Sequence, residues 1–234
     1  MTGPVPPTRA EELLLARITA AAGREHLGKR RGTYTGVVRP ASPKGLWDQG
    51  IGVLLTLARH LGSSAADVRD EARLDLYENG MTAAVKGLIH VVRYDTTSVF
   101  RTGAASHALT GVDGERIVLR DGPGQDDASQ WWAEIERGVT RAQLPRALAA
   151  LGRGERLAFG SIRLTREEIG CGKVRARWPQ VRDLRIRQGA LVLDTVDATS
   201  HDATSHELDA DLSRTPNLFV LRALVERLGR DGRR

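Results

Sequence analysis

Two stretches of this 234-residue chain carry the same succession of short strand patterns and turn signals, followed by a helix pattern. In the first stretch, apolar residues alternate over 74–76 and lead into an Asn79-Gly80 turn. In the second, they alternate over 162–164 before a comparable turn. Alternation with a period of two predicts strands buried on one face, and Asn-Gly is a strong hairpin signal. We therefore expect two copies of one supersecondary unit and an α+β, mainly β fold.

The N-terminus has a different pattern. Thr8 and Glu11 have the spacing of a capping box, in which each residue satisfies a backbone amide of the other. The apolar stripe that follows predicts a helix, and residues 32–39 then have the character of a strand. A further helix is expected over 48–61.

Helices are also expected after each strand block. Apolar residues at helical spacing over 131–151 indicate two successive helices, of which the second would begin at Thr140. Near the C-terminus, Thr215 is the expected N-cap of a last helix, with Pro216 in its first turn. These patterns predict three segments: a helical extension over 1–31, a first unit with an inserted helix over 32–151, and a second, shorter unit with fewer strands over 152–234.

Several short segments resemble a bacterial pleckstrin-homology-like (PH-like) domain, and together they resemble an uncharacterised actinobacterial family with two such units. The segments are residues 76–81, 93–95, 154–160 and 216–228, and the resemblance extends over about 73–228. It implies two small bent sheets or barrels, each followed by a helix. It implies no catalytic residue and no cofactor.

The charge of the chain permits an anionic partner. Arginine dominates an excess that gives a net charge of +6, since the chain has only four lysines. Arginine binds carboxylates and phosphates in a planar fork. A single cysteine, Cys171, precludes an intrachain disulfide and fits a reducing compartment. The chain shows neither a secretory h-region nor an apolar run long enough to span a membrane, so we expect a cytoplasmic protein that is at most peripheral to a membrane.

The strongest candidate site is a set of basic residues in the second strand block that alternate with apolar ones. Alternation places the apolar residues inside and the basic residues outside. If the strands that carry them are neighbours, they share one exposed face. The set is Lys173, Arg175, Arg177, Arg185 and Arg187.

This set predicts a non-catalytic binding or scaffolding module that engages an acidic protein surface or anionic lipid headgroups. Acidic residues nearby, such as Glu168 or Asp183, are the alternative explanation for the charges. A nucleic acid is the less favoured partner for the same face. The least favoured interpretation is a metal-dependent enzyme that uses His201 and His206, which end two consecutive copies of Asp-Ala-Thr-Ser-His. No motif of a hydrolase or of a phosphate-binding loop is present.

Overall fold

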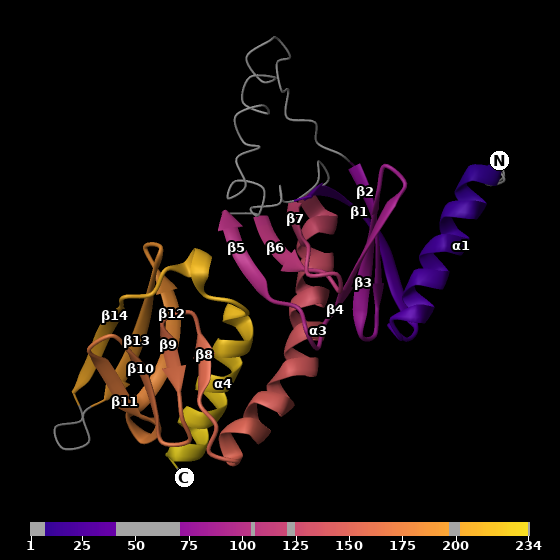
Figure 1. The fold of residues 1–234 in the computed structure, drawn as a ribbon. Helices are drawn as coiled ribbons and strands as arrows, with labels where there is room; N and C mark the ends of the chain where they lie inside the picture. The colour runs from indigo at the N-terminus through magenta and orange to yellow at the C-terminus, as the bar shows by residue number, and fades with distance from the viewer. Residues whose placement is uncertain (1–7, 41–70, 104–105, 121–124, 197–201, 234) are drawn as a thin grey trace, which may run out of the picture.

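A computed structural model describes residues 8–40, 71–103, 106–120, 125–196 and 202–233 of the chain. Antiparallel strands are the most abundant secondary structure in this part, and helices lie between them and near both ends (Figure 1). The expected α+β, mainly β class is therefore confirmed. The helix expected over 48–61 lies outside the described residues.

The first half forms a seven-stranded antiparallel sheet with the order β4-β3-β2-β1-β7-β6-β5. Strands β1 to β4 follow one another as neighbours, as do β5 to β7, and β1 also pairs with β7. A hydrogen bond of 2.9 Å from the Val112 amide to the Val91 carbonyl ties the β6–β7 turn to β4. The strands are β1 (Arg30–Pro40), β2 (Glu71–Tyr77), β3 (Gly80–Val85), β4 (Leu88–Arg93), β5 (Val99–Gly103), β6 (Ser106–Thr110) and β7 (Arg116–Arg120).

The N-terminal helix α1 (Arg9–Arg24) packs against β3 and β4 (Figure 1). Its capping box is confirmed. The Thr8 amide donates to Glu11 Oε2 at 2.6 Å, and the Glu11 amide donates to Thr8 Oγ1 at 3.3 Å. Just beyond the helix, Leu27 is fully buried in a small apolar cluster with Val91, so the N-terminal segment is part of the first half.

A buried carboxylate joins β1 to β2. Asp75 is fully buried, and its oxygens accept hydrogen bonds from Arg73 Nε at 2.7 Å and from Thr33 Oγ1 at 2.5 Å. Burial acts to raise the pKa of Asp75, but the hydrogen bonds from Arg73 and Thr33 and the charges of Arg73 and Arg30 lower it more. The pKa of Asp75 therefore lies below its ordinary value, and the carboxylate stays ionised in the folded protein.

We expect the variant Asp75→Asn to lose less stability in acid than the wild type. Because the pKa of Asp75 is depressed by folding, its charge stabilises the protein above about pH 4, the ordinary aspartate pKa, and this contribution is lost as the pH falls through the lower folded value. At pH 7 the variant should lose about 1 kcal/mol of unfolding free energy, the difference between charged and neutral hydrogen bonds. Urea titrations at pH 7 and pH 3 measure both effects. If the wild type and the variant differ in unfolding free energy by the same amount at the two pH values, this assignment is wrong.

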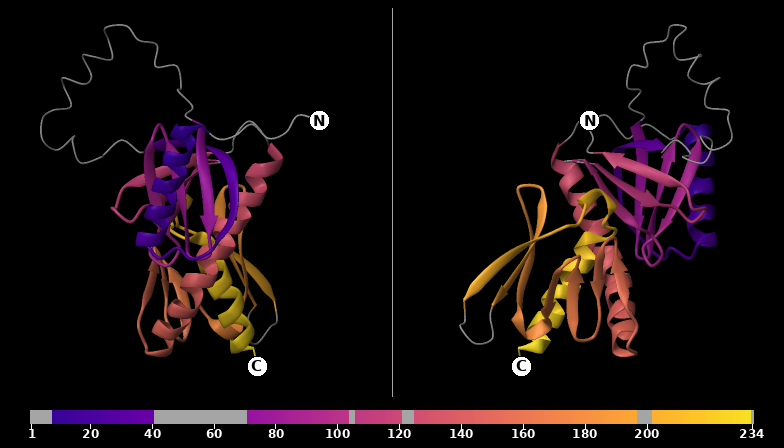
Figure 2. Two further views of the ribbon diagram at one scale, coloured as in Figure 1. Left: turned by 90° about the vertical axis from the view of Figure 1, so that its right-hand side faces the viewer. Right: turned by 60° about the vertical axis from the view of Figure 1, so that its left-hand side comes forward.

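The longest helix, α3 (Gln125–Gly152), extends from the first half of the molecule to the second (Figures 1 and 2). It contacts β1, β2 and β3 of the first sheet, and also β8 and the last helix. The expectation of two helices over 131–151 is therefore wrong, because Thr140 lies within a single helix. Pro145 removes one backbone hydrogen bond, but Val139 and Leu151 on either side of it are buried in the same core, which holds the helix together.

The described part of the second half contains seven further strands in two antiparallel sheets, with the orders β11-β10-β9-β8 and β12-β13-β14. A last helix, α4 (Leu218–Gly232), packs on β12. The expectation that this half has fewer strands is wrong, because β10 and β14 were not recognised from the sequence. The first has only four residues, and the second is mostly exposed and polar, so neither shows a clear apolar alternation. The strands are β8 (Leu157–Phe159), β9 (Ile162–Leu164), β10 (Glu168–Cys171), β11 (Val174–Arg177), β12 (Val181–Arg187), β13 (Ala190–Val196) and β14 (Ala203–Leu208).

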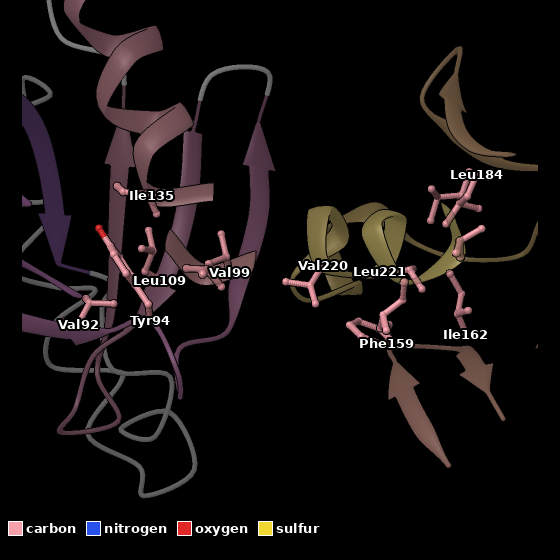
Figure 3. Packing of buried hydrophobic residues seen from close by; sticks show 14 of the residues in the cluster. Val92, Tyr94, Val99, Leu109, Ile135, Phe159, Ile162, Leu184, Val220 and Leu221 are labelled. Atoms are coloured by element: carbon pink, nitrogen blue, oxygen red, sulfur yellow. The ribbon is translucent and has the colours of Figure 1, made fainter. Parts of the chain in front are cut away.

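One apolar core continues through both halves. Figure 3 shows Tyr94 of the first half beside Leu109 and Ile135, and Phe159 of the second half beside Leu221 of α4. These side chains come from three strands or turns and two helices, so the halves share packing as well as a helix.

A buried asparagine joins the halves. Asn217, which precedes α4, has left-handed backbone angles (φ 47°, ψ 46°) and is the N-cap of the helix. Its backbone amide donates to the Val99 carbonyl at 2.8 Å, and its side-chain Oδ1 accepts from the Val99 backbone amide at 2.7 Å. Its Nδ2 donates to Gln143 Oε1 at 2.8 Å and to the Thr97 carbonyl at 3.1 Å. Asn217 thus links α4 to β5 and α3.

This arrangement corrects the expected start of the last helix. Thr215 is not the N-cap, because its Oγ1 donates to the Asp211 carbonyl at 2.8 Å and the helix begins two residues beyond the expected position. Asparagine tolerates the left-handed conformation better than threonine does. No helix in the described part of the chain is both long and apolar enough to cross a membrane.

Candidate anion-binding surface

The basic residues singled out from the sequence are all exposed, but they belong to two different sheets. Lys173, Arg175 and Arg177 lie in or beside β11, an outer strand of the four-stranded sheet. Arg185 and Arg187 lie on β12, an outer strand of the three-stranded sheet. A 3-10 turn, η2 (Trp178–Gln180), separates the two strands, so the condition that they pair as neighbours is not met.

The arginines of β12 lie among acidic groups. Arg185 Nη2 is 2.6 Å from Asp194 Oδ2 on β13, and Ser205 Oγ donates to the other oxygen of the same carboxylate at 2.6 Å. The strand register places Glu207 beside Val192, which is opposite Arg185. The surface of the three-stranded sheet is therefore close to neutral around Arg185.

The four-stranded sheet has a different balance of charge. Its register aligns Arg163 of β9, Gly170 of β10 and Arg175 of β11 in one row across the sheet. Neighbouring residues in such a row point to the same side, so Arg163 and Arg175 flank a position that has no side chain. Arg175 Nη1 lies 3.7 Å from Glu168 Oε1, at the outer limit of an ion pair.

We call the exposed side of this sheet the basic face, and define it by Arg163, Lys173, Arg175 and Arg177. Among the described residues, Arg175 alone of these four has an acidic partner within 4.0 Å, and its side chain is 73% exposed. Like charges on neighbouring strands repel each other. An acidic partner would relieve this repulsion, so the basic face is a better candidate for binding than the β12 arginines.

Sequence reasoning missed Arg163. Its side chain is exposed, and Arg163 Nη1 donates to the Gly160 carbonyl at 2.6 Å. The signal was available, because Ile162 and Leu164 on either side of it are buried and alternation then points Arg163 outward. What the sequence could not supply was the register that brings it level with Arg175.

Comparison with protein-family models matches residues 53–233 to a family of unknown function, DUF6585. This match covers most of the chain. The chain belongs to this family. The expectation of an uncharacterised family is thereby confirmed, whereas the PH-like units and the actinobacterial origin stay predictions. Comparison with curated proteins finds no match.

In the described residues of this DUF6585 member, the predicted histidine pair does not form a metal centre. His201 lies outside them, while His206 Nε2 is 3.1 Å from Thr195 Oγ1 in the neighbouring strand. No cluster of three or more potential ligands occurs in the part of the chain that the structure describes. Cys171 is buried, with its Sγ 3.4 Å from the Asp209 carbonyl, which gives it a structural environment.

Proposed function

We propose that the chain is a non-catalytic, cytoplasmic binding module made of two PH-like units, and that its basic face engages an acidic protein surface. The two units would be β1–β7 with α3 and β8–β14 with α4. In the described residues, each half has seven antiparallel strands followed by a helix, and this supports the proposal of a repeat. An experimental structure whose halves do not superpose would contradict the two-unit assignment.

The observation that carries the binding proposal is the row of Arg163 and Arg175 on either side of Gly170. Guanidinium groups form paired hydrogen bonds with carboxylates, and a glycine between them leaves room for a side chain of the partner. An acidic peptide or protein surface carries carboxylates on nearby residues, so that one partner can reach both arginines. The proposal therefore assigns the recognition to the four-stranded sheet.

Two other partners are less well supported. Anionic lipid is second, because the large apolar residues that are exposed in the described chain, Leu13, Leu88 and Val112, belong to the first half. The basic face therefore has no large apolar side chain beside it to insert into a membrane. Nucleic acid is third, because Trp178, the aromatic residue that follows β11, is buried and cannot stack on bases.

The double variant Arg175→Gln/Arg177→Gln is expected to weaken binding of a glutamate-rich peptide about tenfold at low salt, because it removes two charges from the basic face. Fluorescence anisotropy with a labelled peptide, measured at several salt concentrations, gives the affinity and its salt dependence. Vesicles that contain phosphatidylserine, and duplex DNA, are measured in parallel.

The matched control is Arg185→Gln/Arg187→Gln. It removes the same charge at the same spacing, and in both pairs one arginine has an acidic partner, Glu168 or Asp194. The control should bind the peptide with an affinity within about twofold of the wild type. Equal weakening by both variants would mean that net charge alone drives the binding. Stronger capture by vesicles or DNA than by the peptide would reassign the partner.

A further inference from the structure

A pocket of about 330 Å³ lies in the first half, between α3 and the β1–β2 pair. It is separate from the basic face, which lies in the second half. Arg31 of β1 lines it from the sheet, and Arg137 and Arg141 line it from the helix. The volume falls within the range of small-molecule sites, so the pocket can hold a ligand of modest size.

The two helical arginines point to the same place because they are four residues apart, which is about one turn of helix. Arg137 Nε donates to the Ala133 carbonyl of its own helix at 3.1 Å. Arg141 Nη2 donates to the Glu78 carbonyl at 2.7 Å. Neither guanidinium has an ion-pair partner among the described residues, so both have donors left for a ligand.

The acidic groups near the pocket are already engaged. Glu78 Oε1 accepts from Arg31 Nη2 at 2.9 Å, and Glu78 Oε2 accepts from the Lys29 amide at 3.2 Å. Glu134, which also lines the pocket, accepts a hydrogen bond from the Tyr34 hydroxyl at 3.0 Å. The lining thus contains three guanidinium groups and one carboxylate, and its net charge is positive.

The rest of the wall is apolar and aromatic. Leu76, Tyr77 and Tyr94 line it from the ends of strands, and each of them is almost completely buried. Burial raises the pKa of Tyr94 above its ordinary value, and the charge of Glu134 adds to this effect. Tyr94 is therefore a neutral phenol in the wall. A ligand with an anionic head and a small apolar body matches this combination of surfaces.

We propose that this pocket binds a phosphomonoester, with the phosphate held by Arg31, Arg137 and Arg141 and the attached group against Tyr94. A phosphate offers three terminal oxygens in different directions, which suits donors from two opposite walls. A carboxylate offers two oxygens in one plane and suits a single fork. The phosphate can belong to a soluble metabolite or to a lipid headgroup, since both present the same chemistry.

Phenyl phosphate tests the proposal, because it combines the phosphate with a small aromatic body. Calorimetric titration of the full chain should show saturable binding, with benzoate at least about tenfold weaker because it lacks the third oxygen. Arg137→Gln and Arg141→Gln should each weaken phenyl phosphate about tenfold, the loss of one charge-assisted contact. Arg146→Gln is the control, because Arg146 is exposed on the same helix but outside this pocket, and it should bind like the wild type.

Vesicles of phosphatidylcholine, with and without phosphatidic acid, distinguish the two sources of phosphate. Capture only by the phosphatidic acid vesicles, lost in Arg137→Gln, would assign a lipid headgroup. Binding of phenyl phosphate without vesicle capture would assign a soluble ligand. The proposal is wrong if neither probe binds, if benzoate binds as tightly as phenyl phosphate, or if Arg146→Gln weakens binding as much as the pocket variants do.

Discussion

Asn217→Ala is expected to lower the free energy of unfolding by about 3–5 kcal/mol. The Val99 amide loses its acceptor and Gln143 Oε1 loses its donor, and an unsatisfied buried polar group costs about 1–3 kcal/mol. Alanine in the left-handed conformation adds about 1 kcal/mol. Because these bonds connect α4 with β5 and α3, the loss affects the contact between the halves. Chemical denaturation followed by circular dichroism measures it.

Two further variants separate the causes. Asn217→Gly also removes the side chain but tolerates the positive φ, so it should be about 1 kcal/mol more stable than the alanine variant. Asn217→Asp keeps an acceptor for the Val99 amide but places a carboxylate beside Gln143 Oε1 and the Thr97 carbonyl, so it should also be destabilised. Substitutions at exposed sites usually change the unfolding free energy by no more than about 0.5 kcal/mol. If the alanine and aspartate variants both stay within this range, the buried network contributes little.

Gly138→Ala is expected to cost about 2–3 kcal/mol, although alanine favours helices more than glycine does. A Cβ at this position would clash with Cε2 of the Tyr94 ring, which is almost completely buried. Displacement of Tyr94 would also disturb the wall of the arginine-lined pocket. Thermal denaturation should show a lower midpoint, and the affinity for phenyl phosphate should fall in the folded variant.

The control for this variant is Gly23→Ala in α1. A Cβ at Gly23 would meet nothing within 4 Å, so the intrinsic helix propensity acts alone. This variant should gain about 0.5–1 kcal/mol. The same substitution thus has opposite signs in the two helices. A gain at both positions would mean that Tyr94 can move without cost.

The sequence predicted those parts of the fold that local patterns specify. The α1 capping box, the strand class and the alternation along β11 and β12 follow from spacing alone. The continuous α3 was missed because Thr140 and Gln143 have the spacing of a helix cap. In the structure Gln143 Nε2 donates instead to the carbonyls of Tyr94 and Thr97, and the helix continues through both residues. The role of Asn217 depends on Val99, more than a hundred residues away, and no local signal encodes this contact.

The same limit applies to the binding surfaces. Exposure of Arg175 and Arg185 was predictable from alternation, but the sheet to which each belongs depends on long-range pairing. The pocket arginines illustrate this most clearly. Arg31 and Arg137 are far apart in the sequence, and a run of basic residues such as 29–31 is ordinarily a solvated surface. Only the packing of α3 on β1 and β2 brings them to one cavity.

The unbroken α3 also constrains how a protein of this kind can be divided or recombined. A cut at its C-terminal end would leave Leu151 on one fragment and its core neighbours Phe159 and Leu221 on the other. A fragment of the second half alone would therefore expose an apolar seam and the unpaired amide of Asn217. The shared helix and the shared core therefore join the two halves into one folding unit, and neither half is expected to fold without the other.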